Sequence, residues 1–178
     1  MSNETDSAQS ILSDNNSSIY DRADEWDALR EQYLLPRGQR PATTARGVHH
    51  VALLSTDVVR TIEFFQGLLE FPLTEVFENR DYKGSTHFFF DIGNGNALAY
   101  FDFPDLGLGP YAEVLGGLHH LAISVEPQTW TRLRAKVEAA GIETLVLSES
   151  SLYFDGPDGE RIELISDPLS KMYGQSVG

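Results

Sequence analysis

From residue 47 onward, one order of hydrophobic and polar positions occurs twice along the chain. It begins with a short apolar-rich run typical of a strand, HHVALLS (49–55) and HHLAISV (119–125). Apolar residues then recur every three or four positions, which predicts a helix from Val58 to Leu69 and another from Trp130 to Ala140. Three more strands are expected in each half, at about 72–80, 84–92 and 96–103, and at about 143–149, 151–155 and 160–166.

The two halves also match in sequence, which indicates a duplicated β-α-β-β-β module. GVHHVALLSTD (47–57) matches GLHHLAISVEP (117–127), and FFDIGNGNALAYFDFP (89–104) matches YFDGPDGERIELISDP (153–168) at a constant offset of 64. The turns NGN and GPDG suit tight hairpins. We therefore expect a single domain at 47–168, made of the modules 47–104 and 117–168.

The segments outside this domain carry weaker patterns. Residues 1–18 are polar and acidic, so they predict a disordered tail. Residues 21–34 predict a helix whose Trp26, Leu29 and Tyr33 share one face, and this face is expected to pack on the domain or on a second subunit. A linker to residue 46 completes the N-terminal extension, and residues 169–178 form a C-terminal tail.

Charge and composition narrow the function. The chain of 178 residues has 27 acidic and 13 basic side chains, a net charge of -14, which argues against nucleic acid or an anionic membrane as a partner. It has no cysteine, so disulfides and thiolate metal sites are excluded. No apolar run could span a bilayer and the N-terminus is unlike a signal peptide, so a cytoplasmic protein is predicted.

HHVAL near the start of a module and DGERIEL near its end resemble the vicinal oxygen chelate superfamily. This superfamily includes glyoxalase I, methylmalonyl-CoA epimerase, fosfomycin-resistance enzymes, bleomycin-binding proteins and type I extradiol dioxygenases. The resemblance implies an α+β fold in which two βαβββ modules form an open, cupped, eight-stranded mixed sheet. It also implies that metal ligands project into the cup from the first and last strands of each module.

Those ligand positions are His50 and His120 on the first strands, and Ala99 and Glu163 on the last strands. Alternation along a strand favours the same two histidines, because the small Ala52 and Ala122 share their faces and leave room for a ligand. His49 and His119 then face the helices. Two histidines and one carboxylate, with an alanine at the fourth position, suit Fe(II), with Mn(II), Zn(II) or Ni(II) as alternatives.

Tyr153 and His87 are the candidates for proton handling. Tyr153 lies on the strand next to Glu163 and would share its face if residues 153 and 163 pair. His87 lies two residues before Phe89, the repeat equivalent of Tyr153, so the two should face the same way. Extradiol dioxygenases carry a further histidine shortly before the second metal histidine, and 104–116 has none, which argues against ring cleavage. This segment is either a plain linker or a mobile lid.

The leading hypothesis is an Fe(II)-dependent dioxygenase that acts with O₂ on a small catechol-like or aromatic substrate, as a homodimer. Abundant strand aromatics favour a planar ligand. Arg80 and Arg161 are the only basic residues expected on the strands, which weakens a fosfomycin-type or CoA-type substrate. A glyoxalase-type lyase or isomerase, and a non-catalytic binding protein for a drug or aromatic compound, remain as alternatives.

Overall fold

The computed structural model describes residues 21–172 and 174–177 and divides at Arg46 and Gly47 into an N-terminal unit and a larger domain. The tail expected at 1–18 lies outside these described residues. Within the described chain, no helix is both long enough and apolar enough to cross a membrane.

The N-terminal unit contains helix α2 (Ala23–Tyr33), which the sequence pattern predicts, and a 3-10 turn, η1 (Arg37–Gln39). Acidic residues lie in the first turn of α2 and Arg30 lies in the last, an arrangement that the helix dipole favours. No residue of α2 is buried within this unit. Packing of its Trp26 face on another surface stays a prediction.

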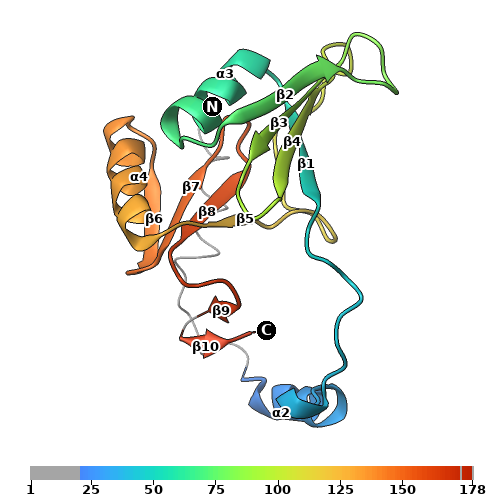
Figure 1. Ribbon diagram of the computed structural model, residues 1–178, viewed down its shortest axis with the longest axis vertical. Coiled ribbons are helices and arrows are strands. Elements are labelled where there is room, and N and C mark those ends of the chain that lie inside the picture. The colour runs from blue at the N-terminus through green and yellow to red at the C-terminus, as the bar shows by residue number, and fades with distance from the viewer. Residues whose placement is uncertain (1–20, 173, 178) are drawn as a thin grey trace. The chain divides into compact units, whose positions relative to one another are not determined.

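The domain is α+β and is built from the two expected modules (Figure 1). In the first module the strands hydrogen-bond in the order β1-β4-β3-β2, with β1 and β4 parallel and the other neighbours antiparallel. Its elements are β1 (His50–Ser55), α3 (Val58–Ile62), the π-helical turn η2 (Glu63–Leu68), β2 (Leu73–Glu78), β3 (Thr86–Asp91) and β4 (Ala97–Asp102).

The second module repeats this plan, with the strand order β5-β8-β7-β6 and β5 parallel to β8. Its elements are β5 (Leu121–Ser124), α4 (Pro127–Ala139), β6 (Thr144–Ser148), β7 (Ser151–Asp155) and β8 (Arg161–Ile165). In the C-terminal segment after residue 168, β9 (Lys171–Met172) pairs with β10 (Gln175–Ser176). The eight strands thus form two four-stranded sheets.

Local signals explain where the module elements begin and turn. The Asp57 carboxylate accepts a hydrogen bond from the backbone N–H of Arg60 and so caps α3. The β3–β4 and β7–β8 turns each contain a glycine with positive φ, Gly95 and Gly159, a conformation that suits glycine. These equivalent turns shorten the connections and fix the same register in both hairpins.

One hydrophobic core lies behind both sheets and contains buried side chains of both modules. Phe65 packs against Phe90 and Tyr100 in the first module, and Trp130 donates a hydrogen bond to the Leu164 carbonyl in the second. Each large apolar side chain buried in this way contributes about 1.5–3 kcal/mol to stability. The two modules therefore share one core.

Two polar contacts fix the end of β1 beside the start of β8. The backbone N–H of Thr56 donates to Asp158 in the β7–β8 turn (3.1 Å), and the Tyr100 hydroxyl donates to Glu160 (2.7 Å). Because β5 starts alongside β8, the start of β5 also lies near the end of β1. β1 and β5, the first strands of the two modules, therefore start at opposite ends of the junction between the sheets.

Candidate metal centre

His120 and Glu163 face one another on the second sheet. Nε2 of His120 lies 3.2 Å from Oε2 of Glu163, whose side chain is 4% exposed. His120 immediately precedes β5, and Ala122 pairs with Glu163, so strand alternation places both side chains on one face. Two ligand atoms bonded at about 2.1 Å and at right angles to one ion lie about 3 Å apart. The observed separation fits a shared divalent ion.

Two neighbours orient this pair. The buried Ser151 hydroxyl donates to Oε1 of Glu163 (2.6 Å), which leaves Oε2 for His120 or an ion. Nδ1 of His120 lies 2.7 Å from Nδ1 of His119, which leaves Nε2 directed at the carboxylate. Groups that hold the second atom of a ligand side chain fix its orientation at metal sites. His119, which was expected to face the helices, is instead exposed and supports His120 directly.

The electrostatics keep His120 in the form that binds metals. Burial lowers the pKa of His120, and His119 and Arg161 lower it further, whereas the Glu163 carboxylate acts in the opposite direction. A neutral imidazole has a free nitrogen lone pair, and this is the form that coordinates a metal. The site thus offers one neutral nitrogen and one buried carboxylate.

Tyr153 lies on the same face as this pair. It is directly opposite Glu163 in the β7–β8 ladder, which is the register in which the two share a face. Its ring centroid lies 5.4 Å from that of His120, in an edge-to-face arrangement, and the residue is 7% exposed. Tyr153 therefore packs against the imidazole from the neighbouring strand.

His50 occupies the equivalent place on the first sheet, where it is exposed. Nδ1 of His50 lies 2.8 Å from Nδ1 of His49, as in the second histidine pair. Ala52 pairs with Ala99, as Ala122 pairs with Glu163. The backbone relationship is therefore repeated, but the first sheet has a methyl group where the second has a carboxylate.

His50 does not join His120 and Glu163 within one chain. The six residues of β1 separate the start of this strand from the end near His120, a distance of roughly 16 Å at about 3.3 Å per residue. Among the described residues, no group of three or more histidine and acidic side chains is close enough to hold a metal ion. The structure brings two of the three expected ligands together.

His87 lies on the same face of the first sheet as His50 and Ala99. It pairs with Phe101 on β4 and with Phe77 on β2, and its ring stacks on Phe101 at a centroid distance of 3.8 Å. Burial lowers the pKa of His87, and the nearby His50 lowers it further. Among the described side chains, Nε2 of His87 is the buried polar atom without a hydrogen-bond partner. The result is a neutral imidazole inside an aromatic cluster.

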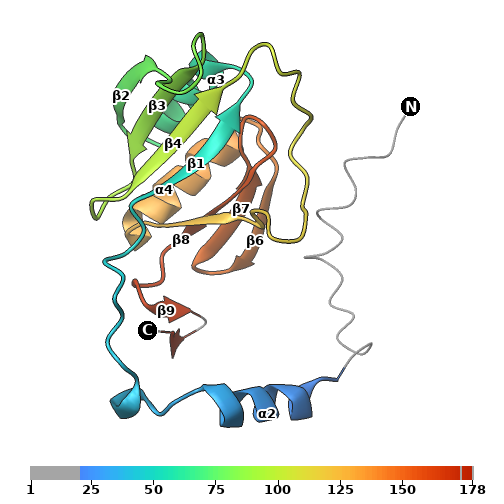
Figure 2. The same ribbon diagram turned by 90° about the vertical axis from the view of Figure 1, so that its right-hand side faces the viewer.

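The linker between β4 and β5 is held against the second sheet. It runs from Phe103 to His120 largely without regular structure (Figure 2). The Tyr111 hydroxyl donates to the carbonyls of Leu118 and His119. Glu113 forms an ion pair of 2.6 Å with Arg161, whose side chain is 5% exposed. These contacts support the linker interpretation of 104–116.

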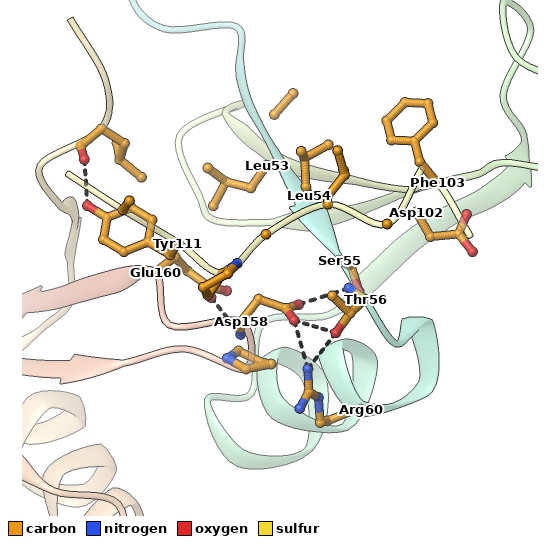
Figure 3. A pocket seen from close by; sticks show the side chains of 18 of the residues that line it. Leu53, Leu54, Ser55, Thr56, Arg60, Asp102, Phe103, Tyr111, Asp158 and Glu160 are labelled. Carbon is orange, nitrogen blue, oxygen red and sulfur yellow. Dashed lines mark hydrogen bonds and ion pairs between the residues drawn. The ribbon is translucent and has the colours of Figure 1, made fainter. Parts of the chain in front are cut away.

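A cavity of about 840 Å³ lies between this linker and the end of β1. Its polar wall is formed by Thr56, Arg60 and Asp158, which bond to one another, and by the buried Glu160 (Figure 3). Burial raises the pKa of Glu160, although the Tyr100 hydroxyl bound to it acts in the opposite direction. The cavity is thus bounded by both modules and by the linker.

Sequence reasoning missed Ser151 and gave Arg161 no role. In the alignment with an offset of 64, Ser151 is the equivalent of His87. Ser151 lies two residues before Tyr153 on the same strand, so the alignment that placed Tyr153 beside Glu163 could also have placed Ser151 on that face. A serine there carries no specific signal for a metal site. Arg80, which was expected on a strand, lies in a turn after β2 and bonds only to the adjacent Asp81 among the described residues.

Residues 47–164 match the family model described as "Glyoxalase/Bleomycin resistance protein/Dioxygenase superfamily". Two curated proteins of Bacillus subtilis (strain 168) are similar. The putative ring-cleaving dioxygenase MhqE is 25% identical over 130 residues, 70% of this chain and 42% of the relative. The putative ring-cleaving dioxygenase MhqA is 26% identical over 141 residues, 74% and 43% respectively. The chain thus spans about two fifths of the length of these relatives.

Solved structures share the fold. The glyoxylase/bleomycin resistance protein/dioxygenase domain from Frankia sp. EAN1pec has a TM-score of 0.61 at 18% identity, with 70% of this chain and all of that chain covered. A putative dioxygenase from Bacillus subtilis has a TM-score of 0.60 at 19% identity, with 71% and 42% covered. The fosfomycin resistance protein FosX from Mesorhizobium loti has a TM-score of 0.56 at 20% identity, with 71% and 95% covered.

Proposed function

Because the chain belongs to the Glyoxalase/Bleomycin resistance protein/Dioxygenase superfamily, we propose that it is a metal-dependent dioxygenase acting on a small catechol-like substrate. The observation that carries the proposal is the His120–Glu163 pair, whose Nε2 and Oε2 lie 3.2 Å apart on one sheet face. The names of the two Bacillus relatives support the reaction class. The reaction would add both atoms of O₂ to the substrate, with the substrate as the source of the electrons.

The residues present fit a divalent metal, for which one chain supplies two ligands. His120 and Glu163 would each supply one ligand atom, and Ser151 and His119 would hold these side chains in place. When bound, a metal such as Fe(II) would offer neighbouring positions to the two oxygens of a catechol and to O₂. Mn(II), Zn(II) and Ni(II) suit the same nitrogen and oxygen ligands, so metal analysis decides between them.

The third ligand is proposed to be His50 of a second copy of the chain. The repeated backbone gives each copy one His120–Glu163 pair and one exposed His50, at opposite ends of the junction between its sheets. A symmetric homodimer can bring the His50 of each copy to the pair of the other, because a two-fold axis makes both contacts equivalent. Two identical sites would then form in each dimer.

Tyr153 and His87 are the proposed proton-handling residues. The Tyr153 ring packs against the His120 imidazole on the ligand face, from which its phenol can orient an oxygen of the substrate. Burial lowers the pKa of His87, which favours the neutral imidazole, and its Nε2 has no hydrogen-bond partner among the described residues, so this nitrogen is proposed to accept a proton once substrate is bound. In the homodimer, His87 would reach the site from the same module as His50.

Oxygen uptake tests the proposal. Protein purified without oxygen and loaded with Fe(II) or Mn(II) is expected to consume O₂ with members of a catechol panel, and Glu163→Gln is expected to stop this consumption. Glu63→Gln serves as the matched control, because Glu63 is an exposed carboxylate on η2, outside the sheet face that carries His50. Turnover with Zn(II) or Ni(II) but without O₂ consumption would establish a lyase or isomerase instead. Ligand binding that needs no metal would establish a binding protein.

A further inference from the structure

Arg161 is the one lysine or arginine on β1 to β8, the eight described strands of the two modules. Arg161 and Glu163 are two positions apart on β8, so their side chains lie on the same face, with the two backbone positions roughly 7 Å apart. The Arg161 side chain is 5% exposed, so its charge lies in a desolvated position beside the candidate centre. A buried guanidinium needs an anionic partner, because an unpaired charge in such a place is strongly unfavourable.

The present partner of Arg161 is suited to exchange. Glu113 comes from the irregular linker, its side chain is 27% exposed, and it meets Arg161 at 2.6 Å. Arg161 also approaches Nε2 of His119 at 3.4 Å. A carboxylate that replaces Glu113 would keep the charge of the pair unchanged and would let Glu113 return to water. Such an exchange avoids leaving the buried cation unpaired.

We propose that the substrate carries a carboxylate that takes the place of Glu113 on Arg161, while its vicinal oxygens lie at His120 and Glu163. This inference rests on the proposed function for the position of the oxygens, and it adds the substrate class, an aromatic acid with two neighbouring hydroxyls. The backbone positions 161 and 163 are roughly 7 Å apart, a spacing that is on the scale of one substituted aromatic ring. Glu113 acts as an internal competitor whose side chain the substrate displaces from Arg161.

Binding measurements on two catechols that differ in the carboxylate test this proposal. Metal-loaded protein without oxygen is titrated with 3,4-dihydroxybenzoate and with 4-methylcatechol in a calorimeter. We expect the acid to bind about threefold tighter or more, because its contact with Arg161 replaces the Arg161–Glu113 ion pair and only the difference between the two is gained. Glu113→Gln should tighten binding of the acid by about fivefold or more and leave 4-methylcatechol unchanged. Arg161→Gln should remove the preference, and Arg161→Lys should keep part of it.

Asp105→Asn is the matched control, because it removes one negative charge from the same linker. Asp105 is exposed, and no ion pair joins it to Arg161 in the described structure. This variant should bind both catechols like the wild type, and an increase equal to that of Glu113→Gln would overturn the proposal, since general charge would explain it. Equal affinity of the wild type for the two catechols would also overturn it. The Glu113→Gln arm keeps Arg161 in place and does not depend on how well Arg161→Gln folds.

Benzoate separates failure of this inference from failure of the proposed function, because it has a carboxylate but no vicinal oxygens. If no catechol binds with metal, yet benzoate binds to Glu113→Gln and not to Arg161→Gln, the anion site stands and the dioxygenase proposal falls. If Glu113→Gln does not bind benzoate, the anion site falls. Tighter binding of phenylphosphonate than of benzoate would overturn the assignment to a carboxylate.

Discussion

At equivalent positions of its last two strands, the first module carries His87, Phe89 and Ala99, whereas the second carries Ser151, Tyr153 and Glu163. The ladders that present these residues have the same register, so the backbone does not account for the difference. Side chains alone give one sheet an aromatic face with a neutral histidine and the other a buried carboxylate with its supporting hydroxyl. One module therefore presents an apolar, aromatic face and the other presents a buried carboxylate.

The largest effect is expected from removing the carboxylate of the second module. Glu163→Gln should lower metal affinity by at least about 100-fold, because a neutral amide is a poor replacement for a carboxylate ligand. Equilibrium dialysis against Mn(II) measures the loss. The control in the first module, Glu63→Gln, should leave the affinity within about twofold, and an equal loss in both variants would show that the effect of Glu163→Gln is not specific to the site.

Mixing two inactive variants tests whether the modules of different copies cooperate. His50→Ala lacks the ligand of the first module and Glu163→Gln lacks one of the second, so each should be inactive alone. In a mixed dimer one of the two sites keeps all three ligands. After the subunits are unfolded and refolded together, oxygen uptake should recover to about a quarter of the wild-type level. No recovery, with mixed dimers verified by mass spectrometry, would contradict a site shared between copies.

Ser151→Ala should weaken metal binding by about 10- to 100-fold, because the Glu163 carboxylate loses the hydroxyl that holds its Oε1. The measurement is again dialysis against Mn(II), with the thermal midpoint recorded to exclude a loss of fold. Ser85→Ala is a useful control, since Ser85 is a buried serine of the first module that bonds Asn79. Unchanged metal affinity in Ser151→Ala would reduce Ser151 to a packing role.

His87→Phe separates stability from proton handling in the first module. It replaces a ring whose buried Nε2 has no partner among the described residues by one that suits the surrounding aromatic side chains. Stability should rise by about 1 kcal/mol, as measured by urea unfolding, because an unsatisfied polar atom is removed. Oxygen uptake should fall in the same variant. A gain in stability with full activity would leave His87 as a packing residue only.

The smallest effect concerns Glu160, which links the modules through Tyr100. Burial raises the pKa of Glu160 in the folded protein, so its contribution to stability is complete below the ordinary value of 4.5 and is lost as pH rises through the raised value. Glu160→Gln should remove this loss. The difference in urea midpoint between the variant and the wild type should therefore grow in favour of the variant as pH rises from about 4 toward neutrality. A difference independent of pH would contradict the assignment.

Much of the fold follows from local patterns in the sequence. The duplicated strands, the helix spacing and the faces of His120, Glu163 and Tyr153 all depend on alternation and on turn length, which a single module determines. The placement of one module on the other does not, because it depends on contacts such as Tyr100 with Glu160, which are far apart in sequence. For this reason the sequence predicted three ligands in one cup, whereas the structure brings two together. Cytoplasmic location and the homodimer stay predictions.

Ala99 has a consequence for design. Ala99 pairs with Ala52, which lies two residues after His50, and Glu163 pairs with Ala122, which lies two residues after His120. Position 99 and His50 are therefore related by the same strand geometry as Glu163 and His120. The fold therefore contains a second backbone frame for a histidine–carboxylate pair, in which one side chain has been truncated to a methyl group. The side chain at position 99, and not the fold, therefore determines whether the chain carries one such pair or two.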